Sequence, residues 1–525
     1  MESIAWRDEK LLLKDGVNLI SRIWTPANGG GPWPALLMRQ PYGREIASTV
    51  TFNHPVWWAS HGYLVVVQDV RGQGGSEGTF TGFKQEASDT SQTHEWVRSL
   101  QDCNGLLGTY GFSYQGLTQL TANPNTRPPE CLAPAMTGLN ENDHWSCDGG
   151  AFWWHLGLAW GLQLAALKAN RNGDQERWER IRNSLENKTY LKEGALLLKE
   201  IDPQGMAYDW FTRSSKNNQE WIVHQPPANW LRQPMLLIGG WWDPHLRGVI
   251  DLYQKSIEAG GAPELHIGPA THLQWWAEAQ ELLLSFFNQH LKSPTTKRIK
   301  APKQRLWNIT KKVWQLSNQS TNPSHYWGLS SQGAACLDPN EGVLQPNLKS
   351  FGTLNIVHDP WRPVPAIGGH LSPQAGLADR KDLDMRGDIA TFTSKELKDN
   401  LRLEGIPVLK LIVKADKDGF DLCVALSVIN HKETKVLQIS TGILRVIGEA
   451  AKEELAREVR FQAVLADIKR GEKLRLSIAG SAWPAIGINP GQSNTPCGAT
   501  GVHCNVITIN LTLSGSNFHV LPLLA

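Results

Sequence analysis

The sequence predicts an α/β protein with a doubly wound parallel sheet, an inserted helical cap and a following all-β domain. Short apolar runs ending in Gly-rich turns alternate with helical patterns over residues 1–141 and again over 230–295, which is typical of an open parallel sheet. Residues 142–229 between them lose the strand pattern and carry helical patterns. Residues 296–525 hold a linker and then recurrent short alternating strands, which favour a two-sheet jelly-roll sandwich.

The first part of the chain supplies one half of the predicted sheet. Residues 9–24 indicate a hairpin around the turn Lys14-Asp15-Gly16. Apolar runs at 34–38 and 63–67 have the length of buried strands, and residues 85–100 place apolar side chains on one helical face. Because the chemistry of such a sheet lies beyond the carboxyl ends of its strands, functional residues are expected in the turns that follow these runs.

The cap and the second half of the sheet follow. Residues 152–169 predict a helix that is apolar on several faces, and 175–187 predict a charged helix. The sheet resumes with short apolar runs at 234–238 and 264–267. A helix over 276–291 closes this domain.

The C-terminal part has a different texture. Pro- and Lys-rich residues 293–303 indicate a connector, and a helical pattern occurs only at 452–457. The other periodic segments alternate as strands do, and they are 354–357, 408–413, 422–429, 436–446, 459–465, 474–478 and 506–513.

Composition limits the class of protein. The net charge is only +2, so there is no electrostatic argument for a nucleic acid or an anionic membrane as partner. The chain has no N-terminal signal pattern and no apolar run of about 18 residues, so we expect a soluble, cytoplasmic protein. Seven scattered cysteines without a C-x-x-C pair indicate reduced thiols, although Cys497 and Cys504 are close enough in sequence to form a bridge.

The segment 107–117 carries the motif on which the functional argument depends. Its sequence Gly111-Phe112-Ser113-Tyr114-Gln115-Gly116 resembles a nucleophile elbow, in which a serine is raised on a tight strand-to-helix turn. The second glycine comes one residue later than in the strict G-x-S-x-G pattern. Alone, the motif also fits an ordinary turn, so the other groups of a hydrolase site must support it.

Those groups occur in the expected order. A serine hydrolase on a doubly wound sheet needs a nucleophile, then a carboxylate, then a histidine, and Ser113, Asp243 and His272 each follow a predicted strand. His245 is a competing histidine, but it follows the same strand as Asp243. Asp69 also follows a strand, but it precedes the nucleophile and is better explained as a residue that fixes its own loop.

Two further features complete the predicted site. The Tyr114 N–H and the Tyr42 hydroxyl are candidate oxyanion donors, since one lies directly after the serine and the other in an early strand-to-helix loop. The Gly-rich loop after Asp69 lacks the G-K-[ST] ending of a phosphate-binding loop.

Tryptophan is unusually frequent, with 23 residues. Most belong to the core, and the candidates for a substrate pocket are Trp145, Trp153, Trp154 and Trp242.

At this point the chain resembles the cocaine esterase and X-Pro dipeptidyl-peptidase family of serine hydrolases, which includes α-amino-acid ester hydrolases and glutaryl acylases. The matching stretches extend over nearly the whole chain, and they are Pro41-Tyr42, 68–72, 111–116, 239–243, 268–272, 358–360 with 363–369, 481–484 and Asn489-Pro490. The resemblance implies an α/β-hydrolase domain, a helical cap and a jelly-roll domain of the galactose-binding-like type. It also implies Ser113 as nucleophile, His272 as base and Asp243 as its partner, an oxyanion hole of Tyr42 and Tyr114, and no metal or organic cofactor.

Departures from the family pattern narrow the expected substrate. No carboxylate follows Ser113 closely, whereas the α-amino-acid ester hydrolases have one there for a free amine. We therefore expect hydrolysis of an acyl ester, or of an amide, through an acyl-serine intermediate. An X-Pro dipeptidyl-peptidase activity stays open, with Asp143 and Asp148 as candidate amine-binding acids in exposed loops, and so does a catalytically silent binding protein. The expected partner is a small-molecule ester or amide substrate, and assembly into a homo-oligomer stays open.

Overall fold

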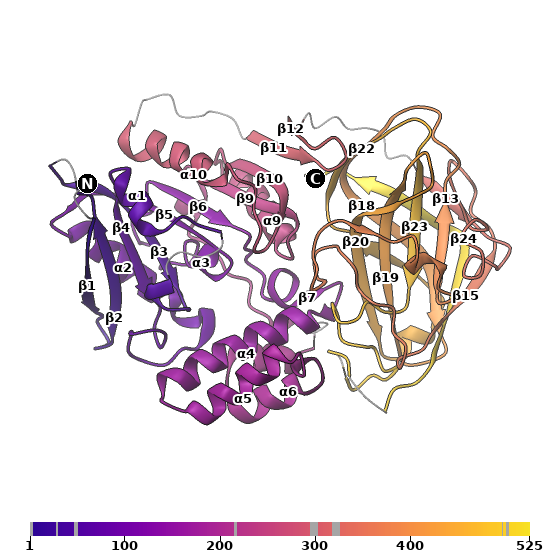
Figure 1. Ribbon diagram of the computed structural model, residues 1–525, viewed down its shortest axis with the longest axis horizontal. Helices are drawn as coiled ribbons and strands as arrows, with labels where there is room; N and C mark the ends of the chain where they lie inside the picture. The colour runs from indigo at the N-terminus through magenta and orange to yellow at the C-terminus, as the bar shows by residue number, and fades with distance from the viewer. Residues whose placement is uncertain are drawn as a thin grey trace.

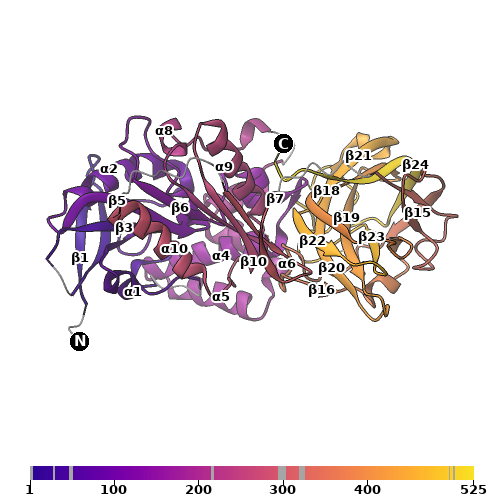
Figure 2. The ribbon, with the colours of Figure 1, turned by 90° about the horizontal axis from the view of Figure 1, so that it is seen from above.

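The computed structural model consists of an α/β domain, a helical cap and a C-terminal β domain, which lie side by side (Figures 1 and 2). It describes residues 4–27, 30–46, 51–214, 218–293, 303–317, 326–495, 497–499 and 503–524. No helix within these ranges is long and apolar enough to cross a membrane. The predicted succession of sheet, helices, sheet and β domain is the observed one.

The α/β domain is built on a sheet of ten described strands in the order β1-β2-β4-β3-β5-β6-β9-β10-β11-β12. From β4 to β11 all neighbours are parallel, while β1 and β2 form the predicted antiparallel hairpin at one edge. The strands are β1 (Ala5–Leu12), β2 (Asn18–Thr25), β3 (Trp33–Gln40), β4 (Leu64–Asp69), β5 (Cys103–Phe112), β6 (Cys131–Ala135), β9 (Leu236–Trp242), β10 (Glu264–Thr271), β11 (Lys303–Asn308) and β12 (Val313–Leu316).

Helices cover both faces of this sheet because its central strands are apolar on both sides. Leu36 and Val65 pack with the aromatic side chains of α1 and α10, whereas the adjacent residues Leu37 and Val66 pack with Val97 of α2. The domain's helices and helical turns are η1 (Arg44–Ile46), α1 (Pro55–Ser60), η2 (Gly82–Gln85), α2 (Glu86–Ser99), α3 (Tyr114–Leu117), α8 (Ala228–Leu231), α9 (Leu246–Glu258), α10 (Ala279–Phe287) and η5 (Asn288–Lys292). The alternation of buried residues along each strand therefore produces the doubly wound arrangement.

The cap lies between β6 and β9, as predicted. Its apolar helix α4 is buried along Leu158, Leu162 and Ala165. The first turn of α4 is held by the β domain, since the Trp154 and His155 N–H groups donate to carbonyls of that domain at 3.0 Å each. The cap elements are η3 (Asn142–Ser146), β7 (Cys147–Asp148), β8 (Ala151–Phe152), α4 (Trp154–Arg171), α5 (Gln175–Glu186), α6 (Tyr190–Ile201), α7 (Met206–Thr212) and η4 (Asn218–Glu220).

The C-terminal domain is all-β, as predicted. Its main strand order is β16-β20-β19-β23-β17-β14-β13-β24-β18-β21, with β15 paired to β24 and β22 paired to β18. Its elements are β13 (Trp327–Ser330), β14 (Val343–Pro346), β15 (Thr353–His358), β16 (Ala378–Asp379), η6 (Leu383–Met385), β17 (Ile389–Thr393), β18 (Leu401–Ala415), β19 (Gly419–Ile429), β20 (Val436–Ile447), η7 (Glu449–Lys452), β21 (Leu455–Arg460), β22 (Val464–Ile468), β23 (Lys473–Ala479) and β24 (Ile507–Leu521).

Three local expectations differ from the structure. Residues 303–316, expected to belong to the linker and β domain, add β11 and β12 to the α/β sheet. The helix expected at 452–457 is wrong, because its second half enters strand β21, which pairs with β18. The single strand expected at 459–465 is two strands, β21 and β22, which pair with different parts of β18. Most of the predicted connector, residues 294–302, lies outside the described residues.

Candidate active site

Ser113 occupies a strained turn between β5 and α3. Its backbone has φ 58° and ψ −127°, a conformation that a residue with a side chain rarely adopts and that is often found at functional sites. A Cβ on Gly111 would lie 2.4 Å from Cβ of Gln115, and one on Gly116 would lie 2.7 Å from Cβ of Thr137. Both glycines are therefore required for close approach, which explains the displaced second glycine of the motif.

Asp243 and His272 meet at the same edge of the sheet. Asp243 follows β9 and is fully buried, and His272 follows the neighbouring strand β10. The His272 Nδ1–H donates to Oδ2 of Asp243 at 2.6 Å. The second carboxylate oxygen, Oδ1, accepts the backbone N–H of His245 at 2.9 Å. Asp243 is thus committed to orienting His272 and to fixing its own loop.

The position of His272 relative to Ser113 is defined by the residue before the serine. The rings of His272 and Phe112 have centroids 5.1 Å apart. Among the described residues, no hydrogen bond joins the Ser113 hydroxyl to the His272 ring. Their pairing therefore rests on position, and the hydrogen bonds of catalytic groups commonly tighten only when substrate is bound.

Tyr42 presents a hydroxyl whose proton has no acceptor among the described residues. Its oxygen accepts the indole N–H of Trp160, on cap helix α4, at 3.1 Å. Burial raises the pKa of Tyr42 to about 12, with the Trp160 hydrogen bond acting in the opposite direction. The phenol therefore stays protonated at neutral pH and can donate to an oxyanion.

Tyr114 contributes its backbone rather than its side chain. Its N–H is in the first turn of α3, where an amide has no partner within the helix. Its hydroxyl donates to Glu86 at 2.7 Å, and the same carboxylate forms a buried ion pair with Arg39 at 2.7 Å. Burial and the Glu86 charge raise the pKa of Tyr114. This network anchors the residue that carries the candidate oxyanion donor.

The four tryptophans proposed for the pocket lie in different places. Trp242 ends β9 beside Thr271, directly before the candidate acid. Trp145 and Trp153 both pack on the ring of His245, with centroids 4.6 and 5.5 Å away. Trp154 instead packs against Phe211 and Trp483 at the junction of cap and β domain, so its contacts are with that junction.

His245 is the residue whose position sequence reasoning missed. Its ring centroid is 5.0 Å from that of His272, although its Nδ1–H donates to the His144 carbonyl at 2.6 Å and not to Asp243. The available signal was its place two residues after Asp243, in a turn after a strand. That place in sequence indicates a ring near the carboxylate, but it does not show that the ring lies against His272.

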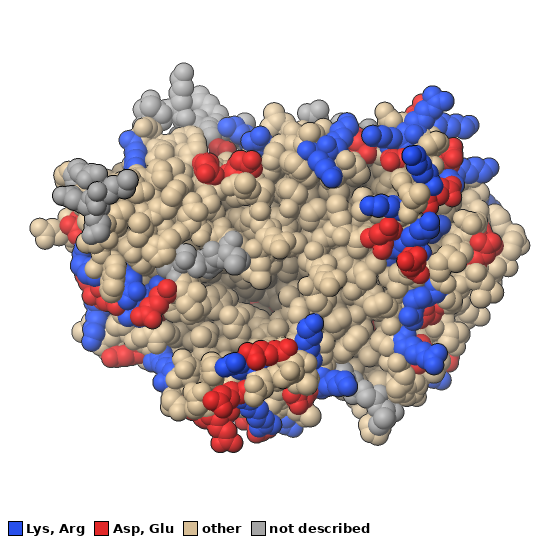
Figure 3. Space-filling view, in the orientation of Figure 1, with Lys and Arg blue, Asp and Glu red and all other residues tan. Residues whose placement is uncertain are grey.

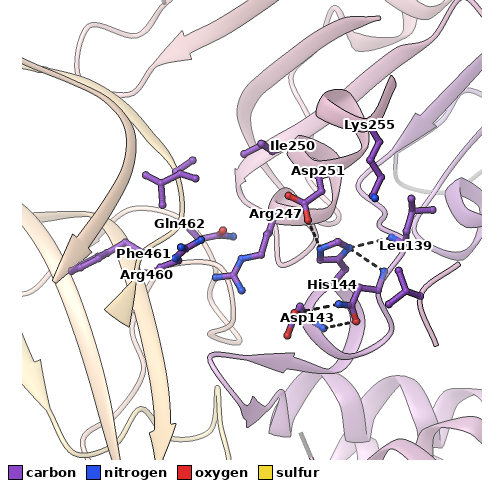
Figure 4. Close-up of a pocket in the computed structure, with 14 residues that line it drawn as sticks. Leu139, Asp143, His144, Arg247, Ile250, Asp251, Lys255, Arg460, Phe461 and Gln462 are labelled. Atoms are coloured by element: carbon purple, nitrogen blue, oxygen red, sulfur yellow. Dashed lines mark hydrogen bonds and ion pairs between the residues drawn. The ribbon is translucent and has the colours of Figure 1, made fainter. Parts of the chain in front are cut away.

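Neither acid suggested for amine binding is an exposed loop residue, since Asp143 is half-buried and Asp148 is buried. Asp148 is buried, not exposed: it accepts from Nε2 of His370 at 2.8 Å and lies 3.6 Å from Arg247. Asp143 lines a separate cavity of about 410 Å³ between α9 and the β domain (Figure 4). A third carboxylate, Glu141, is buried in the cap.

Asp69 fixes its loop, as expected. Its Oδ2 accepts the Gly75 N–H at 2.8 Å and pairs with Arg44 at 2.8 Å. A Cβ on Gly74 would lie 2.3 Å from the same oxygen. The Gly-rich loop therefore surrounds the buried carboxylate of Asp69 and is not a phosphate-binding loop.

The β domain also reaches the site. The Gln462 side chain donates to the backbone carbonyl of Asp243 at 2.8 Å. Trp153 of the cap forms an isolated antiparallel β-bridge with Ile486 of the β domain. All seven cysteines, including Cys497 and Cys504, are free thiols with no disulfide between them. Figure 3 shows a hollow on the face between the three parts, with mostly uncharged residues in its visible wall. No group of three His, Cys, Asp or Glu suited to a metal ion occurs in the described ranges.

Comparisons with known proteins agree with this architecture. Residues 15–274 match the family described as X-Pro dipeptidyl-peptidase (S15 family), and residues 289–519 match the X-Pro dipeptidyl-peptidase C-terminal non-catalytic domain. The chain is 24% identical over 475 residues to the cocaine esterase of Rhodococcus sp. (strain MB1 Bresler), covering 83% of this chain and 82% of that protein.

Solved structures share the fold over nearly the whole chain. An aminopeptidase from the marine sediment archaeon Thaumarchaeota archaeon superimposes with a TM-score of 0.78 at 19% identity, covering 99% of this chain and 96% of that one. An α-amino-acid ester hydrolase gives a TM-score of 0.72 at 20% identity, with 99% and 97% covered. The chain belongs to the X-Pro dipeptidyl-peptidase and cocaine esterase family of hydrolases.

Proposed function

We propose that this protein hydrolyses carboxylic esters of small molecules through an acyl-serine intermediate on Ser113. His272 takes the proton of the Ser113 hydroxyl as the oxygen attacks the ester carbonyl, and later gives it to the leaving alcohol. Asp243 orients His272 and stabilises its charged form. The Tyr42 hydroxyl and the Tyr114 N–H donate to the oxyanion. Water then repeats the sequence and releases the acid.

The observation that carries this proposal is the hydrogen bond of 2.6 Å between His272 and a fully buried Asp243, beside a serine in a strained turn. The hydroxyl of Tyr42 supports the oxyanion assignment, because Trp160 is a donor to the phenol and no acceptor in the described part of the chain takes the phenol's own proton. The unbridged cysteines support a cytoplasmic setting.

Hydrolysis of p-nitrophenyl acetate and butyrate tests the proposal. The unaltered protein should turn over both esters, and Ser113→Ala should abolish turnover. Ser99→Ala is the matched control, because Ser99 lies at the exposed end of α2 and bonds only to Trp96 within its own helix among the described residues. Equal turnover by Ser113→Ala and the control would contradict the assignment of the nucleophile.

Release of X-Pro dipeptides is the second candidate, favoured by the family that residues 15–274 match. That reaction needs a negative group for the substrate ammonium. Glu141, the buried acid of the cap, already accepts from Trp210 at 2.9 Å and from His224 at 3.0 Å. We therefore place the esterase first. Faster cleavage of Gly-Pro p-nitroanilide than of p-nitrophenyl butyrate would reverse this order.

The remaining hypothesis is that the protein is a catalytically silent binding protein. It predicts that a fluorophosphonate probe leaves Ser113 unmodified. The proposed esterase predicts stoichiometric labelling of that serine.

A further inference from the structure

A second imidazole lies in the proposed active site and has no part in the triad. The ring of His245 is 5.0 Å from that of His272 and packs between Trp145 and Trp153. It is 5% exposed. A buried polar ring beside the reacting groups requires an explanation beyond packing.

The protonation of this ring is fixed by its surroundings. His245 Nδ1 donates to the His144 carbonyl at 2.6 Å, so Nδ1 carries the proton and Nε2 carries a lone pair. His144 itself is held firmly: its Nδ1 accepts the N–H groups of Leu139 and Asn140 at 3.1 and 3.2 Å, and its Nε2 donates to Asp251 at 3.0 Å (Figure 4). The tautomer of His245 therefore does not depend on a mobile partner.

The ring is also uncharged at working pH. Burial lowers the pKa of His245 to about 3, with the neighbouring His272 lowering it further and Asp243 acting in the opposite direction. Nε2 of His245 has no hydrogen-bond partner among the described residues. It is nevertheless absent from the set of polar atoms that are completely buried without a partner. This nitrogen therefore keeps some accessible surface and presents a neutral acceptor.

The neighbouring side chains define what such an acceptor can bind. Trp145, Trp153 and Phe112 supply apolar surface around the two imidazoles. Asp243, the nearest carboxylate, is already paired with His272. A substrate ammonium would therefore find an acceptor here but no free negative charge, whereas a hydroxyl needs only the acceptor.

A chain of aromatic contacts connects His245 to the proposed oxyanion donor. Trp145, which packs on His245, also packs on Trp160 with centroids 6.3 Å apart, and Trp160 donates to the hydroxyl of Tyr42. We propose that Nε2 of His245 accepts a hydrogen bond from a hydroxyl on the acyl group bound to Ser113, so that the enzyme prefers hydroxyacyl esters to matched hydrocarbon acyl esters. This inference rests on the proposed esterase function.

Three methyl esters with one frame test the preference directly. Methyl phenylacetate, methyl mandelate and phenylglycine methyl ester carry hydrogen, hydroxyl and amine at the same carbon. We expect kcat/KM to be about 10-fold higher for the mandelate than for the phenylacetate, the size of one hydrogen bond between uncharged groups. At pH 6, where the amine is largely protonated, the phenylglycine ester should not exceed the mandelate.

Substitutions assign the preference to His245. His245→Phe keeps an aromatic ring without an acceptor, and the mandelate-to-phenylacetate ratio should fall close to one. His245→Gln returns an acceptor near the position of Nε2 and should restore part of the ratio. His431→Phe, in an exposed turn of the β domain, is the matched control and should keep the ratio of the unaltered protein.

The outcomes separate this inference from the proposed function. Hydrolysis of the phenylacetate and mandelate at equal rates by the unaltered protein contradicts the role of His245 and leaves the esterase standing. A ratio that survives in His245→Phe does the same, and so does a phenylglycine ester that is the best of the three. If neither ester is cleaved and p-nitrophenyl butyrate is also inert, the esterase proposal itself fails.

Discussion

The loops after β9 and β10 each bring a histidine to the same space, and the two imidazoles are held in opposite ways. His272 donates from Nδ1 to the carboxylate of Asp243, which orients its ring. His245 donates from Nδ1 to a carbonyl and is buried between tryptophans, which lowers its pKa. The rings are 5.0 Å apart. The two loops differ in the partner of Nδ1, and that partner distinguishes the histidine oriented by a carboxylate from the one buried as a neutral ring.

The two phenols follow the same rule. The Tyr42 oxygen accepts from the indole N–H of Trp160, and within the described ranges no acceptor takes its own proton. The Tyr114 hydroxyl meets an acceptor, the Glu86 carboxylate, and so its proton is used. One tyrosine is therefore available through its side chain and the other only through its backbone.

The largest expected effect separates the histidines. His272→Gln should lower kcat for p-nitrophenyl butyrate by a factor on the order of 10⁶, because it removes the base of a triad that acts as a unit. His245→Gln should lower it by less than about 10-fold, because the butyryl group has no hydroxyl for His245 to accept, so that not even one neutral hydrogen bond is lost. Losses of similar size in the two variants would remove the distinction between the loops.

A smaller effect is expected at the carboxylate. Asp243→Asn should lower kcat by about 10⁴, because the amide stabilises the wrong tautomer of His272. A circular-dichroism melt should establish that this variant folds. Retention of more than a tenth of the activity would contradict the role given to Asp243.

The next effect distinguishes the two phenols, since loss of the Tyr42 hydroxyl should lower activity and loss of the Tyr114 hydroxyl should lower stability. Tyr42→Phe should lower kcat by about 10²–10³ through loss of one oxyanion donor. Tyr114→Phe should act mainly on stability, because the buried Glu86 loses a donor at a cost of about 1–3 kcal/mol. Steady-state kinetics and urea unfolding of both variants measure the contrast. A purely catalytic loss in Tyr114→Phe would place its hydroxyl in the site after all.

The smallest expected effect is a pH dependence of stability. An unfolded histidine has a pKa near 6.5, while that of folded His245 is lowered to about 3. As the pH falls below 6.5, His245 becomes protonated in the unfolded state but stays neutral in the folded state. The free energy of unfolding therefore decreases by an amount that approaches about 1.4 kcal/mol per pH unit. The free energy of unfolding should therefore fall more steeply between pH 6 and 4.5 in the unaltered protein than in His245→Gln. Parallel curves would show that His245 is not buried as a neutral ring.

Much of the fold could be predicted from the sequence because it depends on local patterns. The apolar runs at 34–38 and 63–67 have the length of buried strands, and the turns after β5, β9 and β10 carry the groups that a hydrolase needs at one sheet edge. Strands β11 and β12 were missed because they follow the connector and join the sheet through pairing over a long sequence distance. The helix expected at 452–457 was overridden by pairing of β21 with β18.

The walls of the site could not be predicted in the same way. Trp154 and Trp145 belong to the same segment, but one contacts the β domain and the other contacts His245. The choice depends on how the cap packs, which no short motif encodes. The link from Gln462 to the Asp243 loop joins residues more than two hundred positions apart, and nothing in either segment indicates it.

Labelling by a fluorophosphonate, followed by peptide mass spectrometry, tests the central claim most directly. The account predicts stoichiometric modification of Ser113 in the unaltered protein, loss of labelling in His272→Gln, and labelling in His245→Gln at a rate within about 10-fold of the unaltered protein. Modification of a different serine, or labelling that depends on His245 as strongly as on His272, would contradict it.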